Sequence, residues 1–302
     1  MNKHSATTES QDNIMLGAAY AAAAFFLLAL MGACVKLLSD ANHHVMEIAF
    51  YRNLVPFLPM IAYAVLWRKT ELLIPKNPPL LALRVAIGIT GLIATFSALA
   101  SLPMSDATVI FMTSNLIIPI LAYFILKEHV GPHRWIAIAA GFIGVIMVAG
   151  PTGQVNLTGV LYALAAAGLQ ASIQIILRRL KNENAFTVTF YFISGGIIIP
   201  GLFMPWVAEI PTQRDILLFL GVGISGGFAQ YCLTSAYKYA PASIAAPFNY
   251  TGLLWATGLD VLIWKHIPGW PVFVGGAIII AAKLYILHRE ALRKNKDKKT
   301  QP

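Results

Sequence analysis

Long runs of apolar residues, separated by short polar gaps, are the main pattern along this chain. Each run is about 20 residues long, which is the length of helix needed to cross ~30 Å of hydrocarbon. The gaps carry turn residues, such as Ser39-Asp40-Ala41-Asn42 and Pro151-Thr152-Gly153. The pattern predicts an all-α membrane protein of ten spanning helices, at 14–38, 45–67, 80–101, 105–126, 133–150, 157–179, 186–207, 214–236, 242–264 and 270–288.

The composition supports a membrane environment. Hydrophobic residues make up 58% of the 302 positions and charged residues only 12%, with a mean hydropathy of +0.69. A soluble domain carries about 25% charged residues, so lipid is expected to replace water over most of this surface. The net charge of +9 is spread over short gaps and the tail Arg289 to Lys299. No single basic face forms, which disfavours a nucleic-acid partner and leaves the bilayer and a small-molecule substrate as expected partners.

The positions of Lys and Arg predict the direction of insertion. If the N-terminus is inside, most of these residues fall in inside segments, and Arg84 at the start of the third span is counted with them. The outside segments then hold only Arg214 and Lys265. By the positive-inside rule, both termini are expected in the cytoplasm of a bacterial cell, with the chain crossing the inner membrane many times.

A weak internal repeat divides the chain into two halves. Leu102-Pro103-Met104-Ser105-Asp106-Ala107 recurs 138 positions later as Ala240-Pro241-Ala242-Ser243-Ile244-Ala245. Glycines mark the last helix of each half, at Gly141 and Gly144 and at Gly275 and Gly276. Five spans per half is an odd number, so the second copy is inverted in the membrane, as in many secondary transporters. The predicted organisation is a polar tail at 1–13, five-helix repeats at 14–150 and 157–288, and a basic tail at 289–302.

Several segments resemble EamA-type members of the drug/metabolite transporter superfamily, over about residues 14–290. The first half contributes Glu47-Ile48-Ala49-Phe50-Tyr51-Arg52, Leu102-Pro103-Met104-Ser105-Asp106-Ala107-Thr108 and Leu126-Lys127-Glu128-His129-Val130. The second contributes Ala245-Ala246-Pro247-Phe248-Asn249-Tyr250 and the end of the last span. Their order across ten spans carries the resemblance, since no single segment is diagnostic.

The resemblance implies a carrier of amphipathic metabolites, with the first four helices of each half around the cavity and the fifth and tenth helices peripheral. The Glu47–Arg52 and Ala246–Tyr250 segments also look like the S-adenosylmethionine uptake branch, which is a hint about the substrate. The sequence departs from the family pattern at His266, where an acidic residue is usual, at Asn115, where proline is frequent, and at Lys283, where glycine is usual.

Polar side chains within the apolar runs are the candidate binding residues, because a carrier needs convergent hydrogen-bonding groups in an apolar cavity. Gln170 and Gln174 lie four positions apart and share one face of a helix. Asn249 and Tyr250 follow Pro247, which frees a backbone carbonyl. The predicted substrate-binding set is Arg52, Asn115, Gln170, Gln174, Asn249, Tyr250 and Trp255. The alternative reading is that these amides simply hold neighbouring helices together.

Burying a charge in lipid costs about 2.5–3.5 kcal/mol on insertion scales, so a charged residue inside an apolar run needs an explanation. Each has a functional and a structural interpretation. Arg52 either faces the cavity as a cation for an anionic group, or forms a structural ion pair with Glu47 or Asp260. Asp260 is the candidate titrating group for coupling. Lys36 is expected to reach the membrane surface along its aliphatic stem.

Transport by alternating access of a small amphipathic metabolite, amino-acid-like, nucleoside-like or vitamin-like, is the function that these features predict. The alternatives are an intramembrane enzyme acting on a lipid-linked substrate and a non-transporting scaffold. No cofactor motif or catalytic triad order occurs in the sequence, and His43-His44 has no cysteine or carboxylate set that would complete a metal site. The small-residue spacing Gly223…Gly227 suits close helix packing, and the chain is expected to be a monomer or a weak homodimer.

Overall fold

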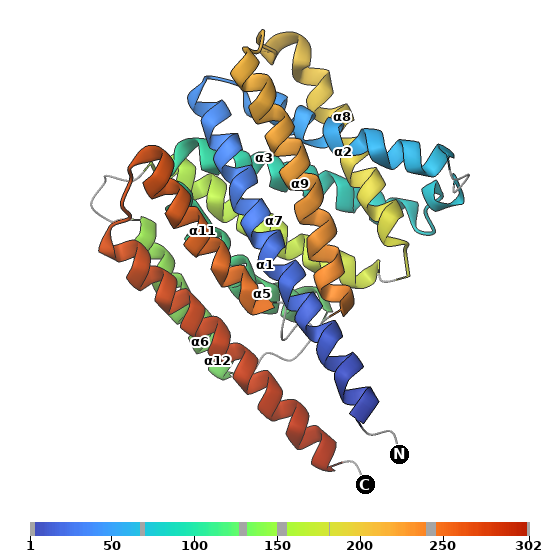
Figure 1. Ribbon diagram of the computed structural model, residues 1–302. Coiled ribbons are helices and arrows are strands. Elements are labelled where there is room, and N and C mark those ends of the chain that lie inside the picture. The colour runs from blue at the N-terminus through green and yellow to red at the C-terminus, as the bar shows by residue number, and fades with distance from the viewer. Residues whose placement is uncertain are drawn as a thin grey trace. The chain divides into compact units, whose positions relative to one another are not determined.

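The computed structural model describes residues 4–66, 70–126, 132–149, 156–180, 182–239 and 246–300, and every regular element within these ranges is helical (Figure 1). In the first half these are α1 (His4–Asp40), α2 (Val45–Leu66), the 3-10 helix η1 (Thr70–Leu73), α3 (Pro78–Ser101), α4 (Met104–Phe111), α5 (Ser114–Leu126) and α6 (Pro132–Ala149). In the second half they are α7 (Leu157–Arg179), α8 (Ala185–Val207), α9 (Gln213–Tyr239), the 3-10 helix η2 (Ala246–Tyr250), α11 (Thr251–Leu259), the π-helical turn η3 (Asp260–Trp264) and α12 (Trp270–Thr300).

The protein is a multi-pass membrane protein. Among the described residues, 7 stretches are long and apolar enough to span a bilayer, at 15–40, 45–66, 78–101, 104–125, 157–177, 186–207 and 213–233. Two further apolar helices, Trp135–Val148 and Trp270–Ile286, are shorter. Large apolar side chains such as Leu58, Phe203 and Trp206 are exposed on these helices, as is expected of surfaces that face lipid.

The helices group into two compact units that do not follow the sequence repeats. Unit 1 combines residues 1–76 with 183–267, and unit 2 combines residues 77–182 with 268–302. Each unit therefore draws helices from both halves of the chain.

Small residues allow the helices of unit 1 to approach closely. In Figure 1, α1 runs alongside α9, and α2 packs against both α8 and α9. The face of α1 that is buried contains Ala21, Ala24 and Ala33. A Cβ atom added to Gly223 of α9 would overlap the side chain of Val55 on α2. The close packing expected from the Gly223…Gly227 spacing is confirmed.

In unit 2, α3 packs on α7, and α6 packs along α12 (Figure 1). The α6–α12 contact brings backbone against backbone, since a Cβ atom added to Gly275 would lie 2.5 Å from the carbonyl oxygen of Gly144. These are the glycine-bearing final helices of the two sequence repeats. This contact explains Gly144 and Gly275, whereas a Cβ atom added to Gly141 would overlap the side chain of Leu116 on α5.

Most helix bounds lie within a few residues of the predicted spans, and the differences are informative. The helix α1 begins at His4, before the predicted start of the first apolar run, and α12 extends through the basic tail to Thr300. The fourth predicted span is interrupted between α4 and α5, and the ninth divides into η2, α11 and η3. Arg84, counted with the inside segments, is buried within α3 instead.

Candidate functional site

The interruption between α4 and α5 is a tight turn within an apolar span of unit 2. The amide of Asn115 donates to the carbonyl of Met112 over 3.1 Å, and the amide of Leu116 donates to that of Thr113 over 2.8 Å. These bonds span three residues instead of four, so the helix narrows to a 3-10 turn here. Pro119 follows within α5 and cannot donate a backbone hydrogen bond to the carbonyl of Asn115.

Side chains satisfy the backbone at this interruption. The hydroxyl of Thr113, which is fully buried, donates to the carbonyl of Ile110 over 2.7 Å. The side-chain amide of Asn115 donates to the carbonyl of Met112 over 3.1 Å. Backbone groups left open inside a membrane must find such partners or water. Specific side-chain hydrogen bonds therefore stabilise this turn.

Unit 1 contains a corresponding interruption where η2 meets α11. The hydroxyl of Thr251 donates to the carbonyl of Phe248 over 2.6 Å. Asn249 and Tyr250 form the last turn of η2, immediately before α11 begins. Pro247 lies within η2, but its side chain is outside the described residues.

The two interruptions occupy the same position in the repeat. The 138-residue shift that aligns the halves carries Ile110 onto Phe248 and Thr113 onto Thr251. The same hydrogen bond, from a threonine hydroxyl to the carbonyl three residues earlier, therefore occurs in both copies. Discontinuous helices at equivalent positions of two repeats are the usual location of substrate sites in secondary transporters.

The predicted binding residues are divided between the units. Asn115, Gln170 and Gln174 belong to unit 2, where α5 packs on α7. Asn115 and Gln174 are half-buried, and Gln170 is exposed on its helix. The other four, with Asp260, belong to unit 1. Among these, Trp255 contacts the ring of Phe26 on α1, with the ring centroids 5.0 Å apart.

Asp260 is fully buried and opens the π-helical turn η3. Its carbonyl accepts a hydrogen bond from the amide of His266, and Lys265 ends the turn in the left-handed conformation with φ 57°. π-helical turns are rare and frequent at functional sites. Glu128, in one of the segments that carry the family resemblance, lies outside the described residues.

Arg52 is buried within a polar cluster on α2. Its guanidinium lies over the ring of Phe192, 5.5 Å from the centroid, and donates to the side-chain oxygen of Asn53 over 2.9 Å. Asn53, which the sequence interpretation did not include, donates in turn to the carbonyls of Ala49 and Gly196. Because Gly196 is on α8, this amide joins two helices. A buried asparagine beside an arginine in an apolar helix was the available signal.

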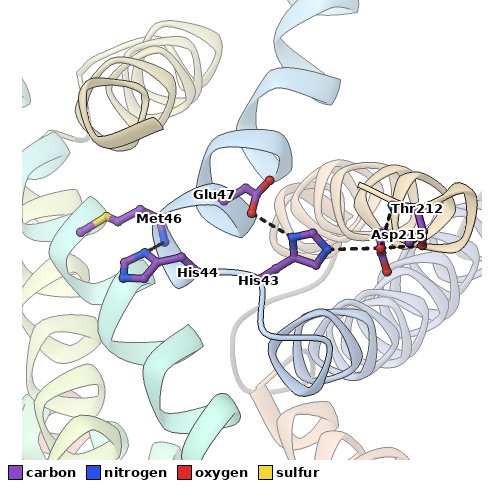
Figure 2. A network of polar contacts seen from close by, with 6 residues as sticks. All are labelled: His43, His44, Met46, Glu47, Thr212 and Asp215. Carbon is purple, nitrogen blue, oxygen red and sulfur yellow. Dashed lines mark hydrogen bonds and ion pairs between the residues drawn. The ribbon is translucent and has the colours of Figure 1, made fainter. Parts of the chain in front are cut away.

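A second group missed from the sequence lies where α1 ends and α2 and α9 begin. Figure 2 shows the ring of His43 between two carboxylates. Nδ1 lies 2.9 Å from Oε2 of Glu47, and Nε2 lies 3.3 Å from Oδ2 of Asp215. All three side chains are buried. The neighbouring His44 is exposed and its Nδ1 accepts from the amide of Met46.

Hydrogen bonds at the start of α9 hold the carboxylate of Asp215 in place. Oδ2 accepts from the amide of Thr212 over 2.9 Å and from its hydroxyl over 2.6 Å, while the amide of Asp215 donates back to that hydroxyl. This reciprocal capping fixes the carboxylate beside the first turn of α9. The spacing of Thr212 and Asp215 was a readable signal of this arrangement.

The surroundings of His43 favour its charged form. Burial alone disfavours the imidazolium, but the hydrogen bonds to Glu47 and Asp215 and their negative charges outweigh it. The pKa of His43 is therefore raised above its usual value. Among the described residues no group of three or more His, Cys, Asp or Glu side chains is arranged so that it could hold a metal ion.

The chain matches one family over most of its length. Residues 15–150 and 157–287 each match the EamA-like transporter family. Three curated relatives are an S-adenosylmethionine uptake transporter of Rickettsia prowazekii, a riboflavin transporter of Rhizobium johnstonii and a pseudopaline exporter of Pseudomonas aeruginosa. The Rickettsia protein is 27% identical over 82% of this chain and 84% of its own length. The riboflavin transporter is 31% identical over 70% of this chain and 71% of its own, and the exporter 26% over 90% and 95%.

The fold resembles that of a protein whose crystal structure is solved. It superposes with a TM-score of 0.64 at 18% identity and covers 93% of this chain and 99% of that chain. The names of the curated relatives indicate transporters and not enzymes. They include both an uptake protein and an exporter.

Proposed function

The chain belongs to the EamA-like transporter family, and on this premise we propose that it carries a small amphipathic metabolite across the bacterial inner membrane by alternating access. The proposed architecture is ten membrane crossings in two inverted five-helix repeats. Both termini are placed in the cytoplasm. Metabolites that are amino-acid-like, nucleoside-like or vitamin-like are the candidate substrates.

The matched helix interruptions at Thr113 and Thr251 carry this proposal. Both lie in apolar segments and both place polar groups beside a narrowed turn. A uniform helix hides its backbone dipoles, whereas an interrupted helix can present carbonyls and amides to a polar solute. A scaffold would have no need for the same interruption in each repeat.

We assign substrate binding to the polar residues at and around these interruptions. Asn115 in unit 2, and Asn249 and Tyr250 in unit 1, lie within two residues of the paired threonines. Arg52, Gln170, Gln174 and Trp255 complete the proposed set. Asp260, fully buried at the π-helical turn, is the candidate coupling carboxylate.

The substrate class follows from the balance of these groups. Within unit 1, Asn249 and Tyr250 provide uncharged hydrogen-bonding groups, Arg52 provides one cation, and Trp255 provides an aromatic face. Such a set suits a solute with a ring and a carboxylate or another anionic group. S-adenosylmethionine and riboflavin, named for two relatives, are therefore the first two solutes to test.

Reconstitution in liposomes tests the proposal. The purified protein would be sealed in vesicles and offered a panel of labelled S-adenosylmethionine, riboflavin, amino acids and nucleosides. We expect the accumulation of at least one solute above that in protein-free vesicles. Chemical conversion of a solute without flux would instead support an intramembrane enzyme, and neither flux nor conversion across the panel would contradict the proposal.

A further inference from the structure

The proposed carrier site makes no use of the His43 cluster, whose hydrogen bonds imply a bound proton. Oδ2 of Asp215 accepts from the amide and the hydroxyl of Thr212, so it acts as an acceptor toward His43 as well. Nε2 of His43 must then carry a hydrogen to make the 3.3 Å contact favourable.

The other ring nitrogen faces a second acceptor. Nδ1 lies 2.9 Å from Oε2 of Glu47. In a neutral imidazole with a hydrogen on Nε2, Nδ1 carries a lone pair, and that lone pair would point at a carboxylate oxygen. The contact therefore requires a hydrogen between Nδ1 and Oε2, and the raised pKa of His43 agrees with a hydrogen on the ring.

We propose that His43, Glu47 and Asp215 form a proton-binding site that closes one end of unit 1. When the proton is bound, the ring donates to both carboxylates and ties the start of α2 to the start of α9. When it leaves Nδ1 for water, the net charge of the three groups falls by one, and no other covalent bond changes.

Loss of the proton acts on Glu47 in particular. Its Oε2 would face the Nδ1 lone pair, and its Oε1 is already buried without a hydrogen-bond partner among the described residues. The Nε2 bond to Asp215 survives, because it needs only the remaining hydrogen. A fully buried carboxylate without a donor has to gain water. The start of α2 therefore opens while the turn stays attached to α9.

The other charged groups at this end have different neighbours. Asp40, at the end of α1, accepts from the indole nitrogen of Trp264 over 2.7 Å, and Lys36 lies over the ring of the same tryptophan. Arg214 is exposed beside Asp215. The His43 ring also contacts Phe219 of α9, with the centroids 5.0 Å apart. Among the described residues, Glu47 and Asp215 are thus the titratable groups that face His43.

The site deepens the proposed function and rests on it for its role in transport. The turn before α2 and the connection before α9 are both placed outside by the proposed topology. Protonation from that side would hold the outer end of unit 1 closed, and release would open it. A carrier with this device takes its solute at a rate that depends on external pH.

Nuclear magnetic resonance of the full-length protein in lipid nanodiscs, labelled at histidine with ¹⁵N and ¹³C, tests proton binding directly. The His43 signals would be assigned by their absence in His43→Gln. We expect the midpoint of His43 to lie above about 6.5, the ordinary value for histidine, and to fall in Glu47→Gln, which keeps the shape but removes the charge. A midpoint at or below the ordinary value, or one unmoved by Glu47→Gln, would overturn the proposal.

Hydrogen exchange of residues 45–53, corrected for the intrinsic effect of pH, tests the opening. We expect protection in the native protein to decrease as the pH rises through the His43 midpoint. His43→Gln can donate to Asp215 but cannot take up a proton, so its protection should not depend on pH. His44→Asn, which retains an acceptor for the amide of Met46, is the matched control and should behave as the native protein. The same pH dependence in His43→Gln would overturn the proposal.

Neither measurement requires a transported solute. A protein that binds the proton as described but moves no solute would contradict the proposed transport function and leave the proton site intact. A protein that moves a solute but whose His43 midpoint is unaltered in Glu47→Gln would contradict the proton site and leave the proposed transport function intact.

Discussion

His43 illustrates how position determines the proton affinity of a histidine. His43 and His44 are adjacent in the sequence, but only His43 is buried and touches carboxylates. Desolvation works against its charge, and two acceptors aligned with its two nitrogens reverse that effect. With a single carboxylate, one of the two ring nitrogens would face no acceptor that favours its protonation.

The raised pKa of His43 makes the stability of the protein depend on pH. The stabilising contribution is complete below the unfolded pKa of about 6.5 and is lost as the pH rises through the folded pKa. We therefore expect the melting temperature of the native protein in lipid to decrease as the pH rises above about 6.5. In His43→Gln the same rise in pH should produce a smaller change. An equal decrease in both proteins would contradict this assignment.

The residue scale also shows what the sequence could reveal. Arg52, Asn115 and Asp260 were identifiable as polar groups in apolar runs, and all three lie in helical segments at least partly removed from solvent. The partners of His43 were not identifiable in the same way. Glu47 is four positions away, but Asp215 lies 172 positions later, at the start of another helix. Helix packing determines which helix ends, distant in the sequence, come together.

At the scale of elements, the helix interruptions are the main departure from the hydrophobic pattern. A run of apolar residues predicts that a segment lies in the membrane, but it is insensitive to a change from four-residue to three-residue hydrogen bonds. Pro119 and Pro247 hinted at irregularity, and the threonines that stabilise it lie outside any simple motif. The span positions were therefore predictable, whereas the interruptions were not.

Replacing the paired threonines tests the interruptions. Thr113→Val and Thr251→Val keep the side-chain shape and remove the hydroxyl that bonds the carbonyl three residues earlier. We expect each to lower the free energy of unfolding by about 0.5–1.5 kcal/mol, the net worth of a hydrogen bond. Thermal unfolding in lipid measures this effect.

Thr90→Val is the matched control for these two variants. Its hydroxyl bonds the carbonyl of Ala86 within the uninterrupted α3, and the residue is exposed. The loss of this bond should change stability less than either test variant. A larger effect at Thr90 than at Thr113 and Thr251 would show that the hydroxyls have no special role at the turns.

The α6–α12 contact gives a second prediction at this scale. In Gly275→Ala the added methyl group would collide with the Gly144 carbonyl and with Val148. Because a backbone carbonyl cannot move aside as a side chain can, we expect a loss of about 1–3 kcal/mol of stability.

Gly168→Ala on α7 provides the comparison, since an added Cβ atom meets nothing within 4 Å there. This variant should be neutral or stabilising by about 0.5–1 kcal/mol, because alanine favours the helix over glycine. Equal melting temperatures for the Gly275→Ala variant and the native protein would contradict the close contact.

At the scale of the whole molecule, contacts between helix ends agree with the predicted crossing pattern. In unit 1 the end of α1, the starts of α2 and α9 and the end of η3 come together through His43 and Trp264. The pattern assigns all four ends to one side. In unit 2 the guanidinium of Arg179 donates to the carbonyl of Ile125, which joins two ends assigned to the other side.

Cysteine labelling in intact cells tests the direction of insertion. With Cys34 and Cys232 replaced by alanine, a single cysteine would be placed at exposed Ala41 or at exposed Asn182. The proposed topology predicts that a membrane-impermeant reagent labels Ala41→Cys from outside, and Asn182→Cys only after the membrane is opened. The opposite pattern would reverse the orientation.

The division into two units also limits what the sequence alone could predict. The repeat correctly indicated two matched halves, and both match the same family. It did not indicate that the compact units exchange helices between the halves. Hydrophobic periodicity locates each helix in the membrane, but it does not determine which helix packs beside it.

Solute flux in proteoliposomes, measured for variants at the two interruptions, tests the central claim most directly. We expect Asn115→Ala and Asn249→Ala each to reduce the flux of the transported solute at least about tenfold, the effect of ~1.4 kcal/mol lost from binding or translocation. Asn182→Ala, in the exposed turn after α7, should retain native flux. Native flux in both test variants, at equal protein content in the vesicles, would contradict the assignment of substrate binding to the residues at each helix interruption.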